Sequence, residues 1–274
     1  AMDSASRHFV QMDELADAVG KRLAELTGAE WGMVTAGCAA ALKMATAACV
    51  AGGNPEKLHL IPDLSGLDKT EVIIPAGSFS AYDFAIQNIG VKIIRVETIE
   101  ELKDALGPKT AMIKLSGGNL VPGSMSLEVI AAITKPLNIP ILADAAAEIL
   151  TIPNVHLKNG ATMVAYSGGK AICGPQCAGL LLGPKNILMS AWQASSPHHG
   201  PGRDNKVGRE ETLGMLAAVE TWVKMDHAAR EKNWMNWVNT IAKRVSGIES
   251  VKTTIREPEG INNRSASLSI SWDP

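Results

Sequence analysis

The sequence lacks the features that would mark a membrane, secreted or nucleic-acid-binding protein. No run among its 274 residues approaches the ~18 consecutive apolar residues of a membrane-spanning helix. No basic start followed by an apolar stretch indicates a signal peptide. The net charge is only −2 and no segment is rich in Lys and Arg, so we expect neither nucleic acid nor a membrane as partner. These absences predict a cytoplasmic protein.

Cysteine is also scarce, and its spacing does not suggest a disulfide framework. The four cysteines are Cys38, Cys49, Cys173 and Cys177. They lie among apolar and small residues, without paired spacing or nearby His, which predicts reduced and mostly buried thiols. A Cys-x3-Cys metal site at 173–177 is the alternative, but we expect no metal.

What the sequence does have is a regular alternation of apolar strands and helices. Hydrophobic residues make up 46% of the chain, enough for a substantial core. Strands are predicted at 31–35, 71–75, 91–96, 110–115, 139–144, 161–167 and 177–183. Helices are predicted at 12–28, 38–52, 80–90, 98–107 and 126–135. Apolar strands separated by helices predict an α/β fold, with a mostly parallel central sheet and helices on both faces.

The pattern changes near residue 205. We predict a large domain over 1–205, followed by a second unit over 206–274. The second unit begins with a long helical segment from 208 to about 246, either one bent helix or two. Strands predicted at 251–257 and 266–272 indicate the start of a small C-terminal α+β domain. Both ends of the sequence look cut.

Groups that carry chemistry follow three of the predicted strands. In open parallel sheets, sites form where the carboxyl ends of strands lead into loops and helices. The turn Ala36-Gly37-Cys38-Ala39 precedes an Ala-rich helix, whose first N–H groups suit a phosphate. The alternative is that Gly37 only permits a tight turn.

Asp144 and Lys170 follow two further strands. A carboxylate at the end of an apolar strand is costly unless it meets a cation or a strong donor, although a helix N-cap is the alternative for Asp144. Lys170 follows Ser167-Gly168-Gly169, and a surface-loop lysine is the alternative there. Separately these signals are weak.

Together, the phosphate turn, the strand-end Asp and the lysine predict a pyridoxal phosphate site. Lys170 would form a Schiff base with the cofactor aldehyde, and Asp144 would keep the pyridine nitrogen protonated. Ser167 would help to hold the phosphate. The glycines beside Lys170 would let the backbone come close to the cofactor.

Three segments carry a resemblance to a known family: "TAGCAAAL", "ADAAAEIL" and "YSGGKAICGPQCAGLLLG". They resemble the selenocysteine synthase-like group of fold-type I pyridoxal phosphate enzymes, and within it the D-glucosaminate-6-phosphate ammonia-lyase branch. The resemblance implies the internal Schiff base on Lys170 and the pyridine-nitrogen partner at Asp144. It implies cofactor contacts by a further set: Gly37, Cys38, Ala39, Ser167 and Gln176.

The resemblance also implies where substrate would bind. The segment "SSPHHGPGRDNKVGREE" matches a loop that carries basic residues near the active site in relatives, which can act across a dimer interface. Arg203, Lys206 and Arg209 are the candidates for a substrate phosphate. His198 and His199 are candidate acid–base groups or, alternatively, solvated loop residues. Phe79 and Tyr82 could cover the cofactor face, but packing in a helix core is the preferred interpretation.

The predicted function is a lyase that releases ammonia and a 2-keto-3-deoxy acid from an amino acid or a 2-amino sugar acid. The alternatives are selenium transfer to seryl-tRNA, cysteine or selenocysteine β-elimination, and a non-catalytic protein of this fold. Net charge −2 speaks against a tRNA partner. Trp222, Trp234 and Trp237 supply more apolar surface than one helix face needs, which predicts a homodimer or higher homo-oligomer. The alternative is packing between the two domains of one chain.

Overall fold

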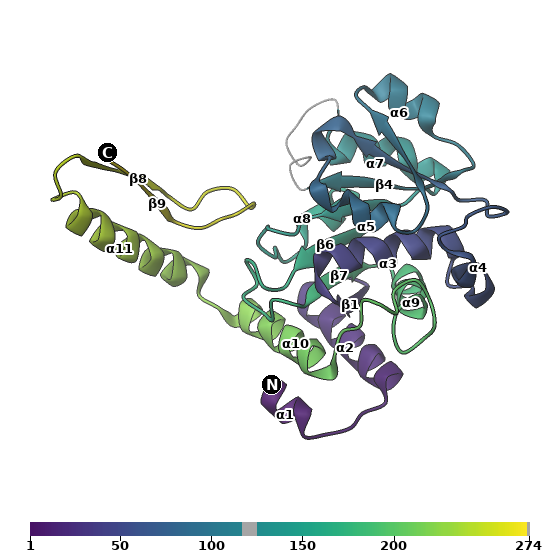
Figure 1. The fold of residues 1–274 in the computed structure, drawn as a ribbon, viewed down its shortest axis with the longest axis horizontal. Coiled ribbons are helices and arrows are strands. Elements are labelled where there is room, and N and C mark those ends of the chain that lie inside the picture. Colours follow the sequence, from purple (N-terminus) through teal and green to yellow (C-terminus); the bar gives the residue numbers. More distant parts are fainter. Residues whose placement is uncertain (117–124, 273–274) are drawn as a thin grey trace.

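A seven-stranded sheet forms the centre of the protein in the computed structural model, which describes residues 1–116 and 125–272 (Figure 1). The strand order is β1-β7-β6-β5-β4-β2-β3. β7 runs antiparallel to both β1 and β6, and every other neighbouring pair is parallel. The strands are β1 Trp31–Thr35, β2 Glu71–Pro75, β3 Lys92–Val96, β4 Thr110–Ser116, β5 Ile141–Asp144, β6 Met163–Ser167 and β7 Gly179–Gly183. The mostly parallel α/β sheet predicted from the sequence is confirmed.

Helices cover both faces of this sheet. The longer helices of the structure are α2 Met12–Thr27, α3 Gly37–Ala51, α7 Leu127–Thr134, α9 Lys185–Gln193, α10 Arg209–Lys224 and α11 His227–Val245, of which α11 packs on the C-terminal hairpin rather than on this sheet. The shorter ones are α1 Met2–Ser6, α4 Pro55–Leu60, α5 Phe84–Gln87, α6 Ile99–Ala105 and α8 Val155–Lys158. Prediction found most of the helices that connect successive strands but missed α1, α4, α8 and α9. Within the described residues, no helix is both long and apolar enough to cross a bilayer.

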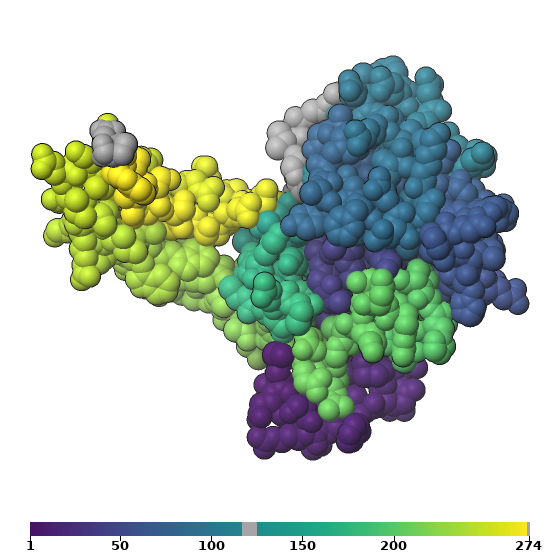
Figure 2. Space-filling model, in the orientation of Figure 1, coloured from purple at the N-terminus to yellow at the C-terminus, as the bar shows by residue number. Residues whose placement is uncertain are grey.

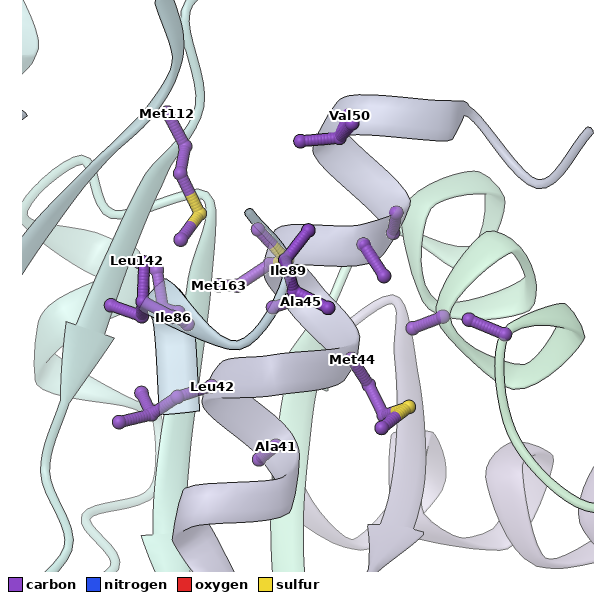
Figure 3. Close-up of a cluster of buried hydrophobic side chains, with 14 of the residues drawn as sticks. Ala41, Leu42, Met44, Ala45, Val50, Ile86, Ile89, Met112, Leu142 and Met163 are labelled. Carbon is purple, nitrogen blue, oxygen red and sulfur yellow. The ribbon is translucent and has the colours of Figure 1, made fainter. Parts of the chain in front are cut away.

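Helix α3 lies across the middle of the sheet and positions the site. Nearly all of its side chains are buried, as expected for a helix that is apolar all round. Its alanines let it approach the sheet closely. Figure 3 shows side chains of α3, among them Leu42, Met44 and Ala45, in a core that also holds Met112 of β4 and Leu142 of β5. A second core cluster fills the opposite face of the sheet.

The segment predicted as a helix over 80–90 is helical over 81–87 and ends near the predicted Gly90, but it is shorter and less regular than expected. It forms a 3-10 turn over 81–83 and then the single turn of α5, with a left-handed Gly90 beyond it. A capping box between Ser80 and Asp83 begins the turn. The Asp83 carboxylate also accepts a hydrogen bond from Lys114 on β4, which ties this turn to the sheet.

The thiols are free, as predicted, but they are not mostly buried. Cys38 is buried and Cys49 is partly buried, whereas Cys173 and Cys177 are exposed. The prediction for this second pair was wrong because the loop that holds them lies at the surface, although the residues around it are small and apolar.

The C-terminal part consists of two helices and a hairpin. The long helical segment is two helices, α10 and α11, which separate at Met225 and Asp226. Strands β8 Val251–Arg256 and β9 Ser267–Trp272 pair antiparallel beside α11. Figure 2 shows α11, β8 and β9 as an arm that projects from the rest of the molecule. The division into domains at residue 205 stays a prediction.

Two interpretations were given for the tryptophans of this part: contact between copies of the chain, or packing within one chain. Trp222 on α10 is buried, and its indole N–H donates to the Leu150 carbonyl at 2.7 Å, so it packs against the main body. Trp237 on α11 is 62% exposed and Trp272 on β9 is 68% exposed. Apolar surface is therefore left open on the arm.

Candidate active site

The carboxyl ends of the parallel strands bring the predicted groups to one edge of the sheet. Asp144 ends β5 and pairs in register with Ser116, the last residue of β4. Ser167 ends β6 opposite Gly179 of β7, and Gly179 in turn lies opposite Thr35 at the end of β1. The turn that begins α3 therefore lies at the same edge as Asp144 and Ser167.

The Asp144 carboxylate is nearly buried, with 10% of its side chain exposed. Its Oδ1 accepts a hydrogen bond from the Ala146 N–H at 3.3 Å and a weaker one from the Cys38 thiol at 3.5 Å. The chain after Asp144 forms a turn, and the next helix begins only at Val155. The helix N-cap interpretation is therefore wrong.

Lys114 lies beside Asp144, and the sequence analysis missed it. Its side chain is fully buried, and its Nζ donates to the Ser78 carbonyl at 2.7 Å and to Asp83 Oδ1 at 2.8 Å. The same Nζ lies 3.9 Å from Asp144 Oδ2. The signal was present in "TAMIKL", because a lysine inside an apolar strand is costly to bury unless carboxylates or carbonyls pair with it.

The charges at this edge do not balance. Among the groups in direct contact, two carboxylates, Asp83 and Asp144, face one ammonium, Lys114, which leaves a surplus of one negative charge that the more distant Lys170 offsets only while its amine is free. Burial raises the pKa of the Cys38 thiol well above its ordinary value, and Asp144 raises it further, whereas the charges of Lys170 and Lys114 lower it. Cys38 is thus a neutral donor, and a bound cation would balance the surplus.

Lys170 is exposed, and it follows the end of β6, the parallel neighbour of the strand β5 that Asp144 ends. Within the described residues, its ammonium makes no hydrogen bond or ion pair. The loop that carries it closes on itself: the Gly168 N–H donates to Ala178 at 2.8 Å, and the Gly174 N–H donates to Gly168 at 2.7 Å. Lys170 therefore presents a free amine from a tightly folded loop.

The close packing of this loop requires glycine at the two positions before Lys170. A Cβ on Gly169 would lie 2.6 Å from the Gln176 Cα, and a Cβ on Gly168 would lie 2.7 Å from the Ala178 carbonyl oxygen. Sequence analysis assigned these glycines to close approach of a cofactor. The structure shows that residues 176–178, which lead into β7, also leave no room for a side chain at these positions. Gln176 itself is exposed.

The first turn of α3 is built to receive an anion. Its N-cap residue, Ala36, has no side-chain acceptor, so no side chain caps the first N–H groups. Gly37 adopts φ +82°, and its carbonyl accepts a hydrogen bond from the Thr35 hydroxyl at 2.8 Å. Free N–H groups at the start of a 15-residue helix favour negative charge. The Ser167 hydroxyl, which makes no hydrogen bond within the described part of the chain, ends the adjacent β6.

The basic loop after α9 is not joined to this cluster within one chain. Arg203 donates to the Ser196 hydroxyl at 3.0 Å and to the Pro197 carbonyl at 2.9 Å, and so closes its own loop. The His199 carbonyl accepts a hydrogen bond from the His59 ring at 2.9 Å. Lys206 is exposed. Among residues 1–116 and 125–272, no hydrogen bond or ion pair links these side chains to Asp144.

Two other candidates in this region have structural roles. Arg209 donates to the carbonyls of Ala5 and Ser6 and anchors the N-terminal helix α1. The His198 ring contacts the Trp192 carbonyl and lies 3.3 Å from Asp13 Oδ1. These contacts explain both residues without a substrate.

The two aromatic candidates, Phe79 and Tyr82, differ in burial. Phe79 is partly buried against the core, with the Arg95 guanidinium 4.3 Å from its ring centroid, as the packing interpretation expected. Tyr82 is 53% exposed, so its assignment to the core was wrong. In the part of the chain that the structure describes, no three His, Cys, Asp or Glu side chains gather as metal ligands would.

A carboxylate, a free lysine and an uncapped helix N-terminus thus lie at the carboxyl edge of an α/β sheet, and together they suit an anionic cofactor with a cationic ring. The chain belongs to the class-V aminotransferase family, whose model matches residues 5–206. Family membership implies pyridoxal phosphate as the cofactor.

Similar proteins agree with this assignment. A D-glucosaminate-6-phosphate ammonia lyase of Salmonella typhimurium is 27% identical over 93% of this chain and 69% of its own length. A 5'-C-glycyluridine monooxygenase-decarboxylase of a Streptomyces species is 29% identical over 90% of this chain and 64% of its own length. An L-seryl-tRNA(Sec) selenium transferase of Proteus mirabilis is 28% identical over 74% of this chain, which covers 44% of that protein. The chain thus spans between 44% and 69% of the length of these relatives.

Solved structures show the same fold. A structure of D-glucosaminate-6-phosphate ammonia-lyase superposes with a TM-score of 0.83 and 26% identity, over 99% of this chain and 73% of that one. The pyridoxal-5'-phosphate dependent protein YhfS from Escherichia coli matches with a TM-score of 0.59 at 16% identity, over 94% of this chain and 65% of that one. The second likeness concerns the fold alone.

The residues at the edge fit pyridoxal phosphate. The surplus negative charge at Asp144 suits a protonated ring nitrogen. The uncapped first turn of α3 suits the phosphate, and the unpaired amine of Lys170 suits the aldehyde. The fit rests on the charges and free donors of this chain as well as on its family.

Proposed function

We propose that this chain carries the catalytic site of a pyridoxal phosphate-dependent lyase that releases ammonia from an amino acid or a 2-amino sugar acid. The observation that supports this most is that Asp144 and Lys170 belong to one edge: Asp144 ends β5, and Lys170 follows the end of the neighbouring parallel strand β6. The similarity to a D-glucosaminate-6-phosphate ammonia lyase supports the reaction class. The product is a 2-keto-3-deoxy acid when the substrate is a 2-amino-3-hydroxy acid.

Each group has a defined task in this reaction. Pyridoxal phosphate supplies an aldehyde that condenses with amines and a ring that withdraws electrons from the substrate Cα. Lys170 would hold the cofactor through its amine, and the same amine, when free, would remove the proton from the substrate Cα. Asp144 would pair with the ring nitrogen. The substrate then loses its 3-hydroxyl as water, and hydrolysis of the remaining C–N bond releases ammonia and the keto acid.

A phosphorylated substrate needs a second anion site, which we propose a neighbouring subunit supplies. Arg203 and Lys206 are exposed and are not joined to Asp144 of their own chain. The exposed Trp237 and Trp272 supply apolar surface for contact between copies. We therefore propose a homodimer or higher oligomer in which the basic loop of one copy serves the site of another.

Substrate release assays test the reaction class directly. The purified protein, loaded with pyridoxal phosphate, is given a panel of amino acids and phosphorylated and free amino sugar acids, and ammonia and keto acid are measured. Equal release of both from an amino sugar acid supports the proposal. Oxygen consumption with CO2 release would instead indicate chemistry like that named for the Streptomyces relative, and selenium transfer to seryl-tRNA would indicate the third relative's activity. Absence of any absorbance from bound cofactor would indicate a non-catalytic protein.

A further inference from the structure

A cleft of about 740 Å³ lies where the C-terminal helices meet the main body of the protein. Its walls come from residues 149–152, the end of α10, the start of α11 and the loop between β8 and β9. Neither Asp144 nor Lys170 lines it. The wall combines apolar side chains with charged or titratable ones: Ile149, Leu150, Ile152 and Val223 are of the first kind, and His227, Arg230, Glu231 and Arg264 of the second.

Arg230 on α11 is held in this wall by aromatic rings. Its Cζ lies 4.7 Å from the ring centroid of Trp222 and 4.7 Å from that of Trp234. Contacts of this kind compensate part of the charge of a guanidinium. They supply no acceptor for the N–H groups at the edge of the guanidinium plane, each of which needs one.

Two of these N–H groups have no partner. Nε and Nη1 of Arg230 are buried and make no hydrogen bond, and within residues 1–116 and 125–272 no other buried side-chain nitrogen or oxygen is left unsatisfied. Buried donors in folded proteins are nearly always paired, so an exception calls for an explanation such as a bound water or ion. Because Arg230 forms part of the cleft wall, a small rotation of its flexible side chain would turn these donors toward an acceptor in the cleft.

The charges in the cleft favour an anion. Glu231 is already engaged, because its carboxylate accepts two hydrogen bonds from Arg264, at 2.6 and 2.9 Å. The His227 ring contacts the Trp222 carbonyl at 3.1 Å. Among the described residues, no carboxylate forms an ion pair with Arg230. The cleft therefore holds one more cation than anion even when His227 is neutral.

We propose that this cleft binds a small organic acid, whose carboxylate or phosphate group accepts hydrogen bonds from Arg230 while its apolar body lies against the apolar part of the wall. The cleft has the volume of a small-molecule site and is larger than one inorganic ion needs. The guanidinium fork suits carboxylate and phosphate alike. The inference concerns a site apart from the cofactor edge and does not rest on the proposed function.

The test is titration calorimetry with benzoate and phenyl phosphate, and with benzamide as the uncharged counterpart of benzoate. Pyridoxal phosphate is present in excess, so that the uncapped turn of α3 is not available to the probes. Arg230→Gln removes the charge, and Arg230→Lys keeps the charge but removes Nε–H and the planar fork. Arg244→Gln is the matched control, because Arg244 is an exposed arginine on the same helix.

We expect the wild type and Arg244→Gln to bind at least one of the two acids with a Kd of about 1 mM or tighter, as ligands of this size reach. Arg230→Gln should bind it about tenfold more weakly or worse, because it loses a charge-assisted hydrogen bond. Arg230→Lys should fall between them, and it decides the matter if a thermal melt shows that Arg230→Gln is unfolded. Equal binding by the wild type and the Arg230 variants, benzamide binding as tightly as benzoate, or no binding of either acid would overturn the proposal.

Discussion

Replacement of Gly179 by alanine should remove the phosphate site while leaving the rest of the protein folded. An added Cβ at Gly179 would lie 2.4 Å from the Gly37 carbonyl carbon and 2.8 Å from the Cys38 nitrogen, whereas ordinary contacts begin at 3.4 Å. These are backbone atoms of the first turn of α3, so no flexible side chain can move aside. The start of α3 must therefore shift from the sheet by about 1 Å.

The size of the effect follows from the contacts that this shift breaks. Hydrogen bonds to a charged group are worth about 1.5–3 kcal/mol each. Loss of two N–H contacts to the phosphate therefore weakens binding of pyridoxal phosphate by about 3–6 kcal/mol, or roughly 10² to 10⁴-fold in Kd. Overpacking costs stability as well, about 1–3 kcal/mol, which lowers the Tm by a few degrees in a chain of this size.

Equilibrium dialysis measures the Kd, and a thermal melt of the cofactor-free protein measures the stability. Gly107→Ala is the control, because a Cβ there has nothing within 4 Å and Gly107 lies between α6 and β4, away from this turn. If Gly179→Ala bound pyridoxal phosphate as tightly as Gly107→Ala, the turn at Gly37 would not be the phosphate site.

Three further predictions concern the carboxylate, the thiol and the assembly. Asp144→Ala should keep the fold by circular dichroism but lose turnover by about a hundredfold or more, because the ring nitrogen loses its ionised partner; near-normal activity would show that the carboxylate has no catalytic role. Burial and Asp144 raise the pKa of Cys38 above its ordinary value of 9.0, so above that pH the unfolded state gives up its thiol proton before the folded state does. Stability is therefore unaffected by this thiol below about pH 9 and falls as the pH rises beyond it, by up to about 1.4 kcal/mol per pH unit, and Cys38→Ser should reduce that slope in urea melts; an unchanged slope would contradict the assignment. Mixing inactive Lys170→Ala with inactive Arg203→Ala should restore part of the activity if Arg203 serves a neighbouring site, whereas no recovery would show that each chain supplies its whole site.

The strand-and-helix order was predictable because the central sheet and the helices around it follow simple periodic rules. Apolar runs such as 71–75 and 141–144 are buried on both faces of a parallel sheet, and they appear in the sequence without alternation. The helix predicted over 80–90 is shorter and begins as a 3-10 turn, and its Asp83 is held by Lys114, a contact distant in sequence. Local periodicity carries no information about that contact.

The candidate site was predictable in part for the same reason. Asp144 and Lys170 stand out because each follows an apolar strand, and parallel strands carry their ends to one edge. Lys114 was missed because it lies inside a strand whose other residues are mostly apolar, so the segment was identified only as a buried strand. The positions of Arg203 and His199 could not be predicted, since they depend on how the loop after α9 folds.

The most direct test of the account is to map the lysine that carries the cofactor. The protein is loaded with pyridoxal phosphate, reduced with borohydride, digested and analysed by mass spectrometry, with Lys114→Met and Lys170→Ala beside the wild type. The account predicts one labelled peptide carrying the modification at Lys170, present in Lys114→Met and absent from Lys170→Ala. A label on Lys114 or on any other lysine, or no label in a protein with bound cofactor, would contradict the assignment of the site.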